Sequence, residues 1–330
     1  MNRKMMLRNA FIGISLVGFM SSNANAGDTN ISLYLKWVPQ YQFAGYLVAK
    51  ANGYYKKMGL NVKIISGGPD INTVQEVADG AAQFGIQTPE PIFYAYEHGL
   101  KLKMLMTDFQ KPYEEFMVKK NSSIKSIEDF KGKTIGINIG GMSQLLLPYI
   151  LEKNGVKPDE VRTVRKTLSL APFLSGRIPI WNGYVGNEPF ESMDAGVPVR
   201  EFKLAKYAPN WYGDTLFSTS SYIKNHPNTV KKFVEASQKG WLFSIKHPQK
   251  TINIILKDNP QKTRKQLEQE ASAVIPLFTS KMAGQDCFGR MSNKRVYSME
   301  NAMIKFGGWK ESKIPSPNIF YTNDFLRCNK

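Results

Sequence analysis

The chain has 330 residues, of which 42% are hydrophobic and 22% are charged, and its formal net charge at pH 7 is +17. These proportions are ordinary for a globular protein with a sizeable core, and the length predicts two domains or one large domain. The lysines are dispersed, without a dense arginine run or a basic helix, so a solvated basic surface is favoured over a surface for nucleic acid, an anionic membrane or an acidic ligand.

Residues 1–26 have the three parts of a secretory signal peptide. Arg3, Lys4 and Arg8 precede the apolar run AFIGISLVGFM, and the stretch SSNANA ends in small residues. Cleavage is expected after Ala26, which sends the mature protein to the periplasm. The apolar run is shorter than the roughly 20 residues that span a bilayer. No later segment is long enough to span one, so a soluble protein is expected.

Strands and helices are predicted to alternate from residue 31 to residue 204. Apolar or alternating runs predict strands at residues 31–37, 61–65, 84–86, 101–109, 133–139, 163–166, 179–186 and 199–204. Helical spacing predicts helices at residues 43–59, 72–83, 89–99 and 140–155. This order indicates a mostly parallel α/β architecture.

Beyond residue 222 the pattern becomes helical. Helices are expected at residues 226–248, 263–278 and 294–309, with Pro227 near the start of the first one. Two strand-like stretches beside polar Ser and Asn residues, 118–124 and 215–221, are expected to carry the chain between two lobes.

The chain has two cysteines, Cys287 and Cys328, both near the C-terminus. Outside the cytoplasm such a pair favours a disulfide, which would hold the tail to the last part of the fold. Their separation and the absence of a nearby histidine argue against a metal site. No HxxxH, CxxC or Ser/His/Asp arrangement is visible, so no metal, cofactor or catalytic residue is predicted.

Several motifs, met in order, resemble the THI5-like (NMT1-like, SsuA/THI5-like) periplasmic substrate-binding proteins. They are KWVPQYQFAGYLVAKANGYYKKMGLNVKI, GGPD with VQEVADGAAQFGI, SIKSIEDFKGKTIGI, WNGYVGNEPFESMDAGVPV and KKFVEASQKGWLFSIKHPQK. The resemblance implies a type II periplasmic-binding-protein fold, with two α/β lobes, a ligand cleft and a double crossover hinge. Lobe 1 would comprise residues 27–120 plus 220–330, and lobe 2 residues 121–219.

The same resemblance implies a function. Members of this group deliver small ligands to the permease of an ABC importer, and the ligand expected here is a flat heterocycle, first of all a thiamine pyrimidine precursor. The protein would act as a monomer. A sulfonate or other anion remains an alternative ligand, because neighbouring groups bind such ligands and the positive charge would suit one.

An enzymatic branch of the family, the thiamine pyrimidine synthases, is the second alternative. That branch uses pyridoxal phosphate, with a Lys shortly after the FGI-like strand and a His on the following helix. Gln87 and Pro91 stand at those positions, and His98 lies further along. The synthase chemistry is therefore disfavoured, because neither the Schiff-base amine nor the histidine donor is present.

Candidate ligand-binding residues lie where predicted strands end, the edge at which parallel sheets bind ligands. They are Trp37, Gln40, Gln42, Gly67, Gly68, Gln87, Thr88, Gly140, Gly141, Met142, Ser143, Trp181, Tyr184, Asn187, Glu188, Trp211 and Tyr212. Other interpretations stay open: core packing for the tryptophans and tyrosines, helix capping for the glutamines, and ordinary turns for the glycines.

Glu188 is the most unusual of these candidates, since it follows the aromatic and glycine-rich stretch WNGYVG. Its carboxylate could accept two hydrogen bonds from an aminopyrimidine edge. The alternative is a charge at a helix start, where the dipole contributes roughly 0.3–1 kcal/mol. The ligand interpretation is favoured.

Overall fold

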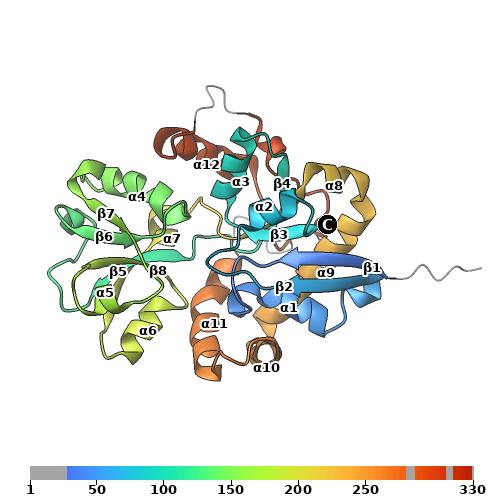
Figure 1. The fold of residues 1–330 in the computed structure, drawn as a ribbon, viewed down its shortest axis with the longest axis horizontal. Coiled ribbons are helices and arrows are strands. Elements are labelled where there is room, and N and C mark those ends of the chain that lie inside the picture. Colours follow the sequence, from blue (N-terminus) through green and yellow to red (C-terminus); the bar gives the residue numbers. More distant parts are fainter. Residues whose placement is uncertain (1–27, 280–286, 310–314, 329–330) are drawn as a thin grey trace, which may run out of the picture.

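The computed structural model describes residues 28–279, 287–309 and 315–328 (Figure 1). The predicted signal peptide, residues 1–26, lies outside these residues. The described chain forms two five-stranded sheets, each flanked by helices, placed side by side (Figure 1). The predicted α/β architecture is confirmed, but the sheets are mixed rather than mostly parallel, because one strand in each sheet runs antiparallel to both of its neighbours.

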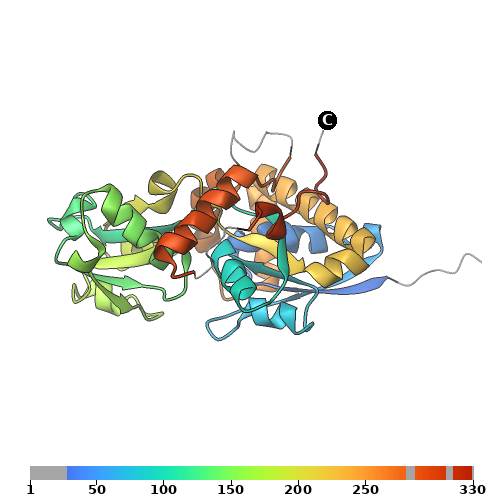
Figure 2. The ribbon, with the colours of Figure 1, turned by 90° about the horizontal axis from the view of Figure 1, so that it is seen from above.

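The first sheet combines the N-terminal strands with a late one. Its order is β2 (Leu60–Ile65), β1 (Thr29–Tyr34), β3 (Phe84–Gln87), β10 (Thr215–Thr219) and β4 (Leu102–Thr107). Strand β1 runs parallel to β2 and β3, whereas β10 is antiparallel to both of its neighbours. The helices associated with this sheet are α1 (Ala44–Ala51), α2 (Thr73–Ala78), α3 (Pro89–Glu97), α8 (Ser220–Asn225), α9 (Pro227–Lys246), α10 (Pro248–Asp258), α11 (Arg264–Phe278) and α12 (Asn293–Phe306). Figure 2 shows α2 and α3 on one face of the sheet and α9 on the other.

The second sheet comes from the middle of the chain. Its order is β7 (Arg162–Arg165), β6 (Thr134–Ile137), β8 (Ile180–Tyr184), β5 (Glu114–Lys119) and β9 (Val199–Lys203). Strand β6 is parallel to β7 and β8, and β5 is antiparallel to β8 and β9. Its helices are α4 (Met142–Lys153), α5 (Ala171–Leu174), α6 (Glu188–Asp194) and α7 (Leu204–Tyr207).

The chain passes between the sheets at residues 108–113 and 208–214, which lie side by side. The Asp108 N–H donates to the Asp214 carbonyl at 2.7 Å, and the Gly213 N–H donates to the Phe109 carbonyl at 3.0 Å. Both crossings come earlier than the stretches expected from sequence, 118–124 and 215–221. The reason is that β5 already belongs to the second sheet and β10 belongs to the first, so the polar residues after them mark strand ends rather than crossings.

Two helical predictions differ from the structure. The helix expected at residues 43–59 is divided into the 3₁₀ turn η1 (Tyr41–Phe43), α1 and the 3₁₀ turn η2 (Lys56–Met58), with Gly53 at φ +68° after α1. Helix α10 was not expected; Pro248 begins it directly after α9. The remaining 3₁₀ turns are η3 (Glu128–Phe130), η4 (Pro158–Glu160) and η6 (Pro317–Ile319).

The two cysteines form a disulfide, Cys287–Cys328, as the sequence suggested. It ties the C-terminal segment to the stretch that precedes α12. Among the described residues, no helix is long and apolar enough to cross a membrane.

Candidate ligand-binding site

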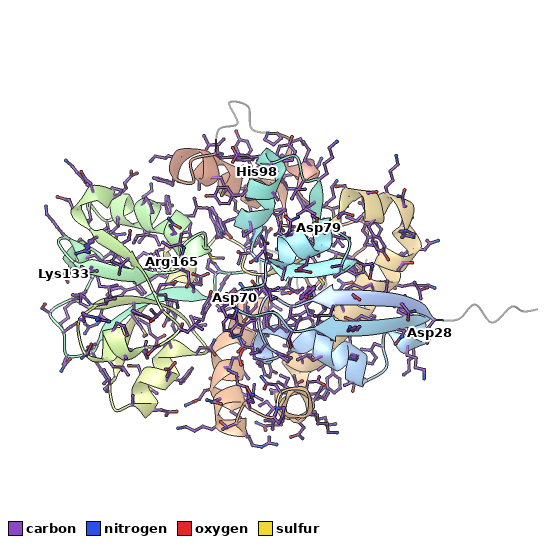
Figure 3. The ribbon with its side chains drawn as sticks, viewed as in Figure 1. Asp28, Asp70, Asp79, His98, Lys133 and Arg165 are labelled. Atoms are coloured by element: carbon purple, nitrogen blue, oxygen red, sulfur yellow. A yellow bond between two sulfur atoms is a disulfide. The ribbon has the colours of Figure 1, made fainter. Side chains whose placement is uncertain are left out.

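The carboxyl ends of β1 and β2 point toward the second sheet (Figure 1). Asp70, in the loop after β2, lies between the two halves of the molecule in Figure 3. On the other side, β8 ends in Tyr184, whose ring stacks on Tyr113 of the first crossing with centroids 5.4 Å apart and planes 23° apart. The carboxyl ends of β1 and β2 in the first sheet and of β8 in the second sheet therefore meet at one place. We call this place the interlobe junction.

A buried polar cluster occupies the junction, formed by Lys36, Gln42, Tyr113 and Asp214. The Lys36 ammonium lies 2.8 Å from the Asp214 carboxylate, whose side chain is fully buried. Tyr113 donates its hydroxyl hydrogen to Asp214 at 2.9 Å, and the Gln42 amide donates to the other Asp214 oxygen at 2.6 Å. Lys36 also donates to the Tyr113 hydroxyl. Asp214, on the second crossing, thus joins the segment after β1, η1 and the first crossing.

The Tyr113 phenol stays protonated in this environment. Burial raises its pKa well above 10, and the negative charge of Asp214 adds to the effect. A protonated hydroxyl can donate to Asp214 while it accepts from Lys36 and from Gln42, the latter at 3.1 Å. Every member of the cluster therefore has a partner, as buried polar groups require.

The Glu188 carboxylate, the most unusual candidate in the sequence, is bound by other residues of this chain. One carboxylate oxygen lies 2.8 Å from the Lys166 ammonium, and the other accepts the backbone N–H of Tyr184 at 2.8 Å. Lys166 also donates to the Asn182 carbonyl at 2.8 Å and lies 5.3 Å from the centroid of the Tyr184 ring. Glu188 is also the first residue of α6, as the helix-start interpretation expected. Its carboxylate is paired with Lys166 at that position.

The turn after β8 also contacts α11 across the junction. A Cβ atom on Gly186 would lie 2.8 Å from Cγ of Glu270, so only glycine allows this approach. One oxygen of Glu270 accepts the backbone N–H of Gln42 at 3.0 Å, while its other oxygen is buried without a partner. Burial raises the pKa of Glu270 to about 7, and this effect outweighs the charge of Lys262, which lowers the pKa.

Gly67 and Gly68 differ in what surrounds them. A Cβ on Gly67 would lie 2.2 Å from the Leu35 carbonyl oxygen and 2.4 Å from the Lys36 carbonyl carbon, whereas a Cβ on Gly68 meets nothing within 4 Å. The Gly67 N–H donates to the Trp37 carbonyl at 3.1 Å. Gly67 thus makes a close approach to the chain's own backbone beside Lys36, and contact of Gly67 or Gly68 with a ligand stays a prediction.

The polar candidates at the ends of β3 and β6 are largely held by neighbours. The Gln87 side-chain oxygen accepts the backbone N–H of Thr88 at 2.9 Å. Ser143 is buried and donates to Glu114, and the Gly140 N–H is taken by the side chain of Gln144 at 2.6 Å. Gly141 caps α4, and Met142 is buried as the first residue of that helix.

The aromatic candidates separate into two groups. Trp181, Trp211 and Tyr212 are buried: Trp181 packs against Gly136, the Trp211 indole donates to Glu90, and the Tyr212 hydroxyl accepts the Ser292 N–H at 2.9 Å. We propose no ligand contact for these three side chains. Trp37 and Tyr184 are half-buried and lie at strand ends that meet at the junction.

Two further candidates remain. Gln40 is buried and donates to Gln42 at 2.8 Å. Asn187 is half-buried and precedes α6 without a side-chain capping bond. Whether they touch a ligand stays a prediction.

Sequence reasoning missed the charged and polar residues that organise the junction. They are Lys36, Tyr113, Lys166, Asp214 and Glu270. Lys36 could have been predicted from the sequence, since it directly precedes Trp37 at the end of the first predicted strand. Asp214 and Tyr113 carried none that could be used, because the crossings were placed later in the chain.

The described residues contain no group of three or more His, Cys, Asp or Glu side chains that could hold a metal ion. If the synthase branch places its lysine and histidine as the resemblance implies, Gln87 and Pro91 stand at those two positions. Pro91 lies inside α3, and His98 follows this helix on the exposed surface.

Residues 40–251 match the family described as NMT1/THI5 like. The chain belongs to this family. The family predicted from the sequence motifs is therefore confirmed.

Named relatives include both a binding protein and an enzyme. The chain is 26% identical over 320 residues to the riboflavin-binding protein RibY of Chloroflexus aurantiacus, covering 92% of this chain and 88% of RibY. It is 22% identical over 313 residues to 4-amino-5-hydroxymethyl-2-methylpyrimidine phosphate synthase THI13 of Saccharomyces cerevisiae, covering 90% and 87% of the two chains.

Among solved structures, the periplasmic aliphatic sulphonate binding protein SsuA of Escherichia coli superimposes with a TM-score of 0.71 at 15% identity. The match covers 88% of this chain and 94% of SsuA. This likeness confirms the predicted type II periplasmic-binding-protein fold.

Proposed function

We propose that the chain is the periplasmic substrate-binding protein of an ABC importer, and that it binds an uncharged, flat nitrogen heterocycle at the interlobe junction. The observation that carries this proposal is the charge balance there. Two ammonium groups at the junction are already neutralised by carboxylates, Lys36 by Asp214 and Lys166 by Glu188.

This charge balance favours an uncharged ligand over an anionic one. A sulfonate or carboxylate would need a cation without a carboxylate partner, or would have to displace Asp214 or Glu188 and leave a buried charge unpaired, which costs several kcal/mol. An uncharged ring avoids that cost. Trp37 and Tyr184 are half-buried aromatic residues, and Trp37 can stack on such a ring, whereas the Tyr184 ring already stacks on Tyr113.

The ligand we favour remains a thiamine pyrimidine precursor. The relative THI13 is named for a pyrimidine of this kind, and an aminopyrimidine has the donors and acceptors that amide and backbone groups can meet. Riboflavin is the second candidate, supported by the higher identity to RibY. Both molecules carry a flat nitrogen heterocycle, so the class of ligand is the same.

A pyrimidine synthase is the alternative function, supported by the identity to THI13. Against it stands the identity of the residues after β3. Gln87 has no amine to form a Schiff base with pyridoxal phosphate, and its amide is engaged with Thr88. Pro91 has no proton-accepting or donating side chain.

Native mass spectrometry and thermal-shift screening of the purified mature protein test the proposal. We expect stabilisation by 4-amino-5-hydroxymethyl-2-methylpyrimidine or riboflavin, and no stabilisation by ethanesulfonate. Stabilisation by sulfonates alone would contradict the ligand class. Bound pyridoxal phosphate with iron-dependent turnover would support the synthase instead.

A further inference from the structure

A hollow of about 370 Å³ lies on the second sheet beside its edge strand β7, which pairs with β6 alone. Three arginines line it: Arg162 and Arg165 from β7, and Arg177 from the loop between α5 and β8. Figure 3 shows Arg165 on this half of the molecule. The other lining residues are Thr134, Val164, Thr167, Pro172, Ile178 and Trp181. None of the lining residues is a carboxylate. We call this site the arginine hollow.

The three guanidinium groups of the arginine hollow are without partners. None makes a hydrogen bond or an ion pair with another residue that the structure describes. Some arginines elsewhere have partners: Arg200 donates to the Ile124 carbonyl at 2.7 Å, and Arg295 is buried, with a donor 2.8 Å from Gln110. Like charges around one concave surface raise its positive potential and attract anions.

Protection of the sheet edge does not explain the third arginine. Charged residues on an edge strand prevent pairing with another chain, and Arg162 and Arg165 can serve that purpose from β7 itself. Arg177 comes from a different segment, yet it lines the same hollow. Arg162 and Arg165 start from opposite faces of β7, so what the three arginines share is the rim of the hollow. An oxyanion bound at this rim can accept two parallel hydrogen bonds from a guanidinium group.

We propose that the arginine hollow is a second binding site, separate from the junction, for a phosphate group. The phosphate can belong to a free small molecule or to a lipid headgroup. The contrast with the junction supports this assignment. Lys166 is adjacent in sequence to Thr167 of the hollow, but its ammonium is paired with Glu188, so the unpaired positive charge at the hollow comes from its arginines.

Titration calorimetry with inorganic pyrophosphate at constant ionic strength tests the proposal on the mature protein. We expect saturable binding to the wild type, weakened by about tenfold or more in the double variant Arg165→Gln, Arg177→Gln, which corresponds to about 1.4 kcal/mol or more. The matched control is Arg264→Gln on α11, which removes one positive charge from an exposed arginine that bonds Gln249 and Asn253. It should change the affinity by less than about twofold, since 0.4 kcal/mol is a minor effect.

A second measurement distinguishes the source of the phosphate. Cosedimentation with phosphatidylglycerol vesicles that depends on Arg165 and Arg177, and that pyrophosphate competes away, indicates a lipid headgroup; pyrophosphate binding without cosedimentation indicates a free ligand. Thermal stabilisation by the heterocycle should be unchanged in the double variant. The proposal is overturned if neither pyrophosphate nor vesicles bind in a manner that depends on these arginines, or if Arg264→Gln weakens binding equally.

Discussion

At the scale of single residues, the junction is organised by carboxylates that already have partners. Asp214 accepts from Lys36, Tyr113 and Gln42, and Glu188 accepts from Lys166 and the Tyr184 N–H. These contacts fix the side chains before any ligand arrives. A site of this kind is preorganised and carries little net charge, which is the basis for expecting an uncharged ligand.

Lys36 is the first residue to test. Replacing it with methionine leaves Asp214 buried with two hydrogen bonds but without its counter-charge, and should lower the free energy of unfolding by about 2–4 kcal/mol. Urea denaturation measures the change. The double variant Lys36→Met, Asp214→Asn should recover most of the loss. Equal destabilisation of the single and double variants would contradict the charge-pair account.

Glu270 predicts a pH dependence of stability. Its pKa is raised from 4.5 to about 7 by burial, so the folded protein holds a proton that the unfolded chain has released. Protonated Glu270 therefore contributes to the free energy of unfolding in full below about pH 4.5. This contribution is lost as the pH rises through 7. The full difference is roughly 3 kcal/mol.

The variant Glu270→Gln keeps the acceptor for the Gln42 N–H and cannot ionise. Between pH 5 and pH 8, its free energy of unfolding should therefore fall less than that of the wild type, by roughly 2.5 kcal/mol. Glu268→Gln, an exposed position on the same helix, is the control and should follow the wild type. Parallel pH profiles for wild type and Glu270→Gln would refute the prediction.

At the scale of elements, loops bring the strand ends together through glycines. Gly67 touches the backbone of Leu35 and Lys36, so the loop after β2 is fitted directly against the loop after β1. Gly186 allows the turn after β8 to lie on Glu270 of α11. These approaches position Lys36 and Gln42, although the glycines need not touch the ligand.

The neighbouring glycines Gly67 and Gly68 provide a matched pair. Gly67→Ala would place Cβ 2.2 Å from the Leu35 carbonyl oxygen, so the backbone must move and heterocycle affinity should fall by about tenfold or more. Gly68→Ala meets no atom within 4 Å and should leave affinity and stability nearly unchanged. Calorimetric titration of both variants checks this. Similar affinities for the two would show that the contact does not matter.

The fold and the family could be predicted from sequence, because periodicity and motif order indicate them. The partners of the site residues could not, because contacts between segments distant in sequence determine them. The alternation of strands and helices, and WNGYVGNEPF with its neighbours, were enough for the fold and the family. Lys166 as the partner of Glu188 could not be predicted, because 22 residues separate them in sequence and only the pairing of β6 with β7 and β8 brings them together. Trp181 was assigned to the site because one strand face cannot be told from the other by alternation alone.

At the scale of the whole molecule, the two sheets are linked by two adjacent crossings, and Asp214 on one crossing is bonded to Tyr113 on the other. A hinge motion of the two halves would strain or reorient this pair, so the polar cluster lies where ligand binding and closure would be coupled. This coupling is a property expected of a binding protein that presents its loaded form to a permease.

The most direct test of the uncharged-ligand account is calorimetric titration of the mature protein at low and high salt with 4-amino-5-hydroxymethyl-2-methylpyrimidine, riboflavin and ethanesulfonate. Interactions between charges weaken as salt shortens the Debye length from about 10 Å at 0.1 M to about 3 Å at 1 M. The account predicts saturable binding of at least one heterocycle, with an affinity that stays nearly constant between these two salt concentrations, and no binding of ethanesulfonate. Binding of ethanesulfonate alone, with an affinity that falls as salt rises, would contradict it.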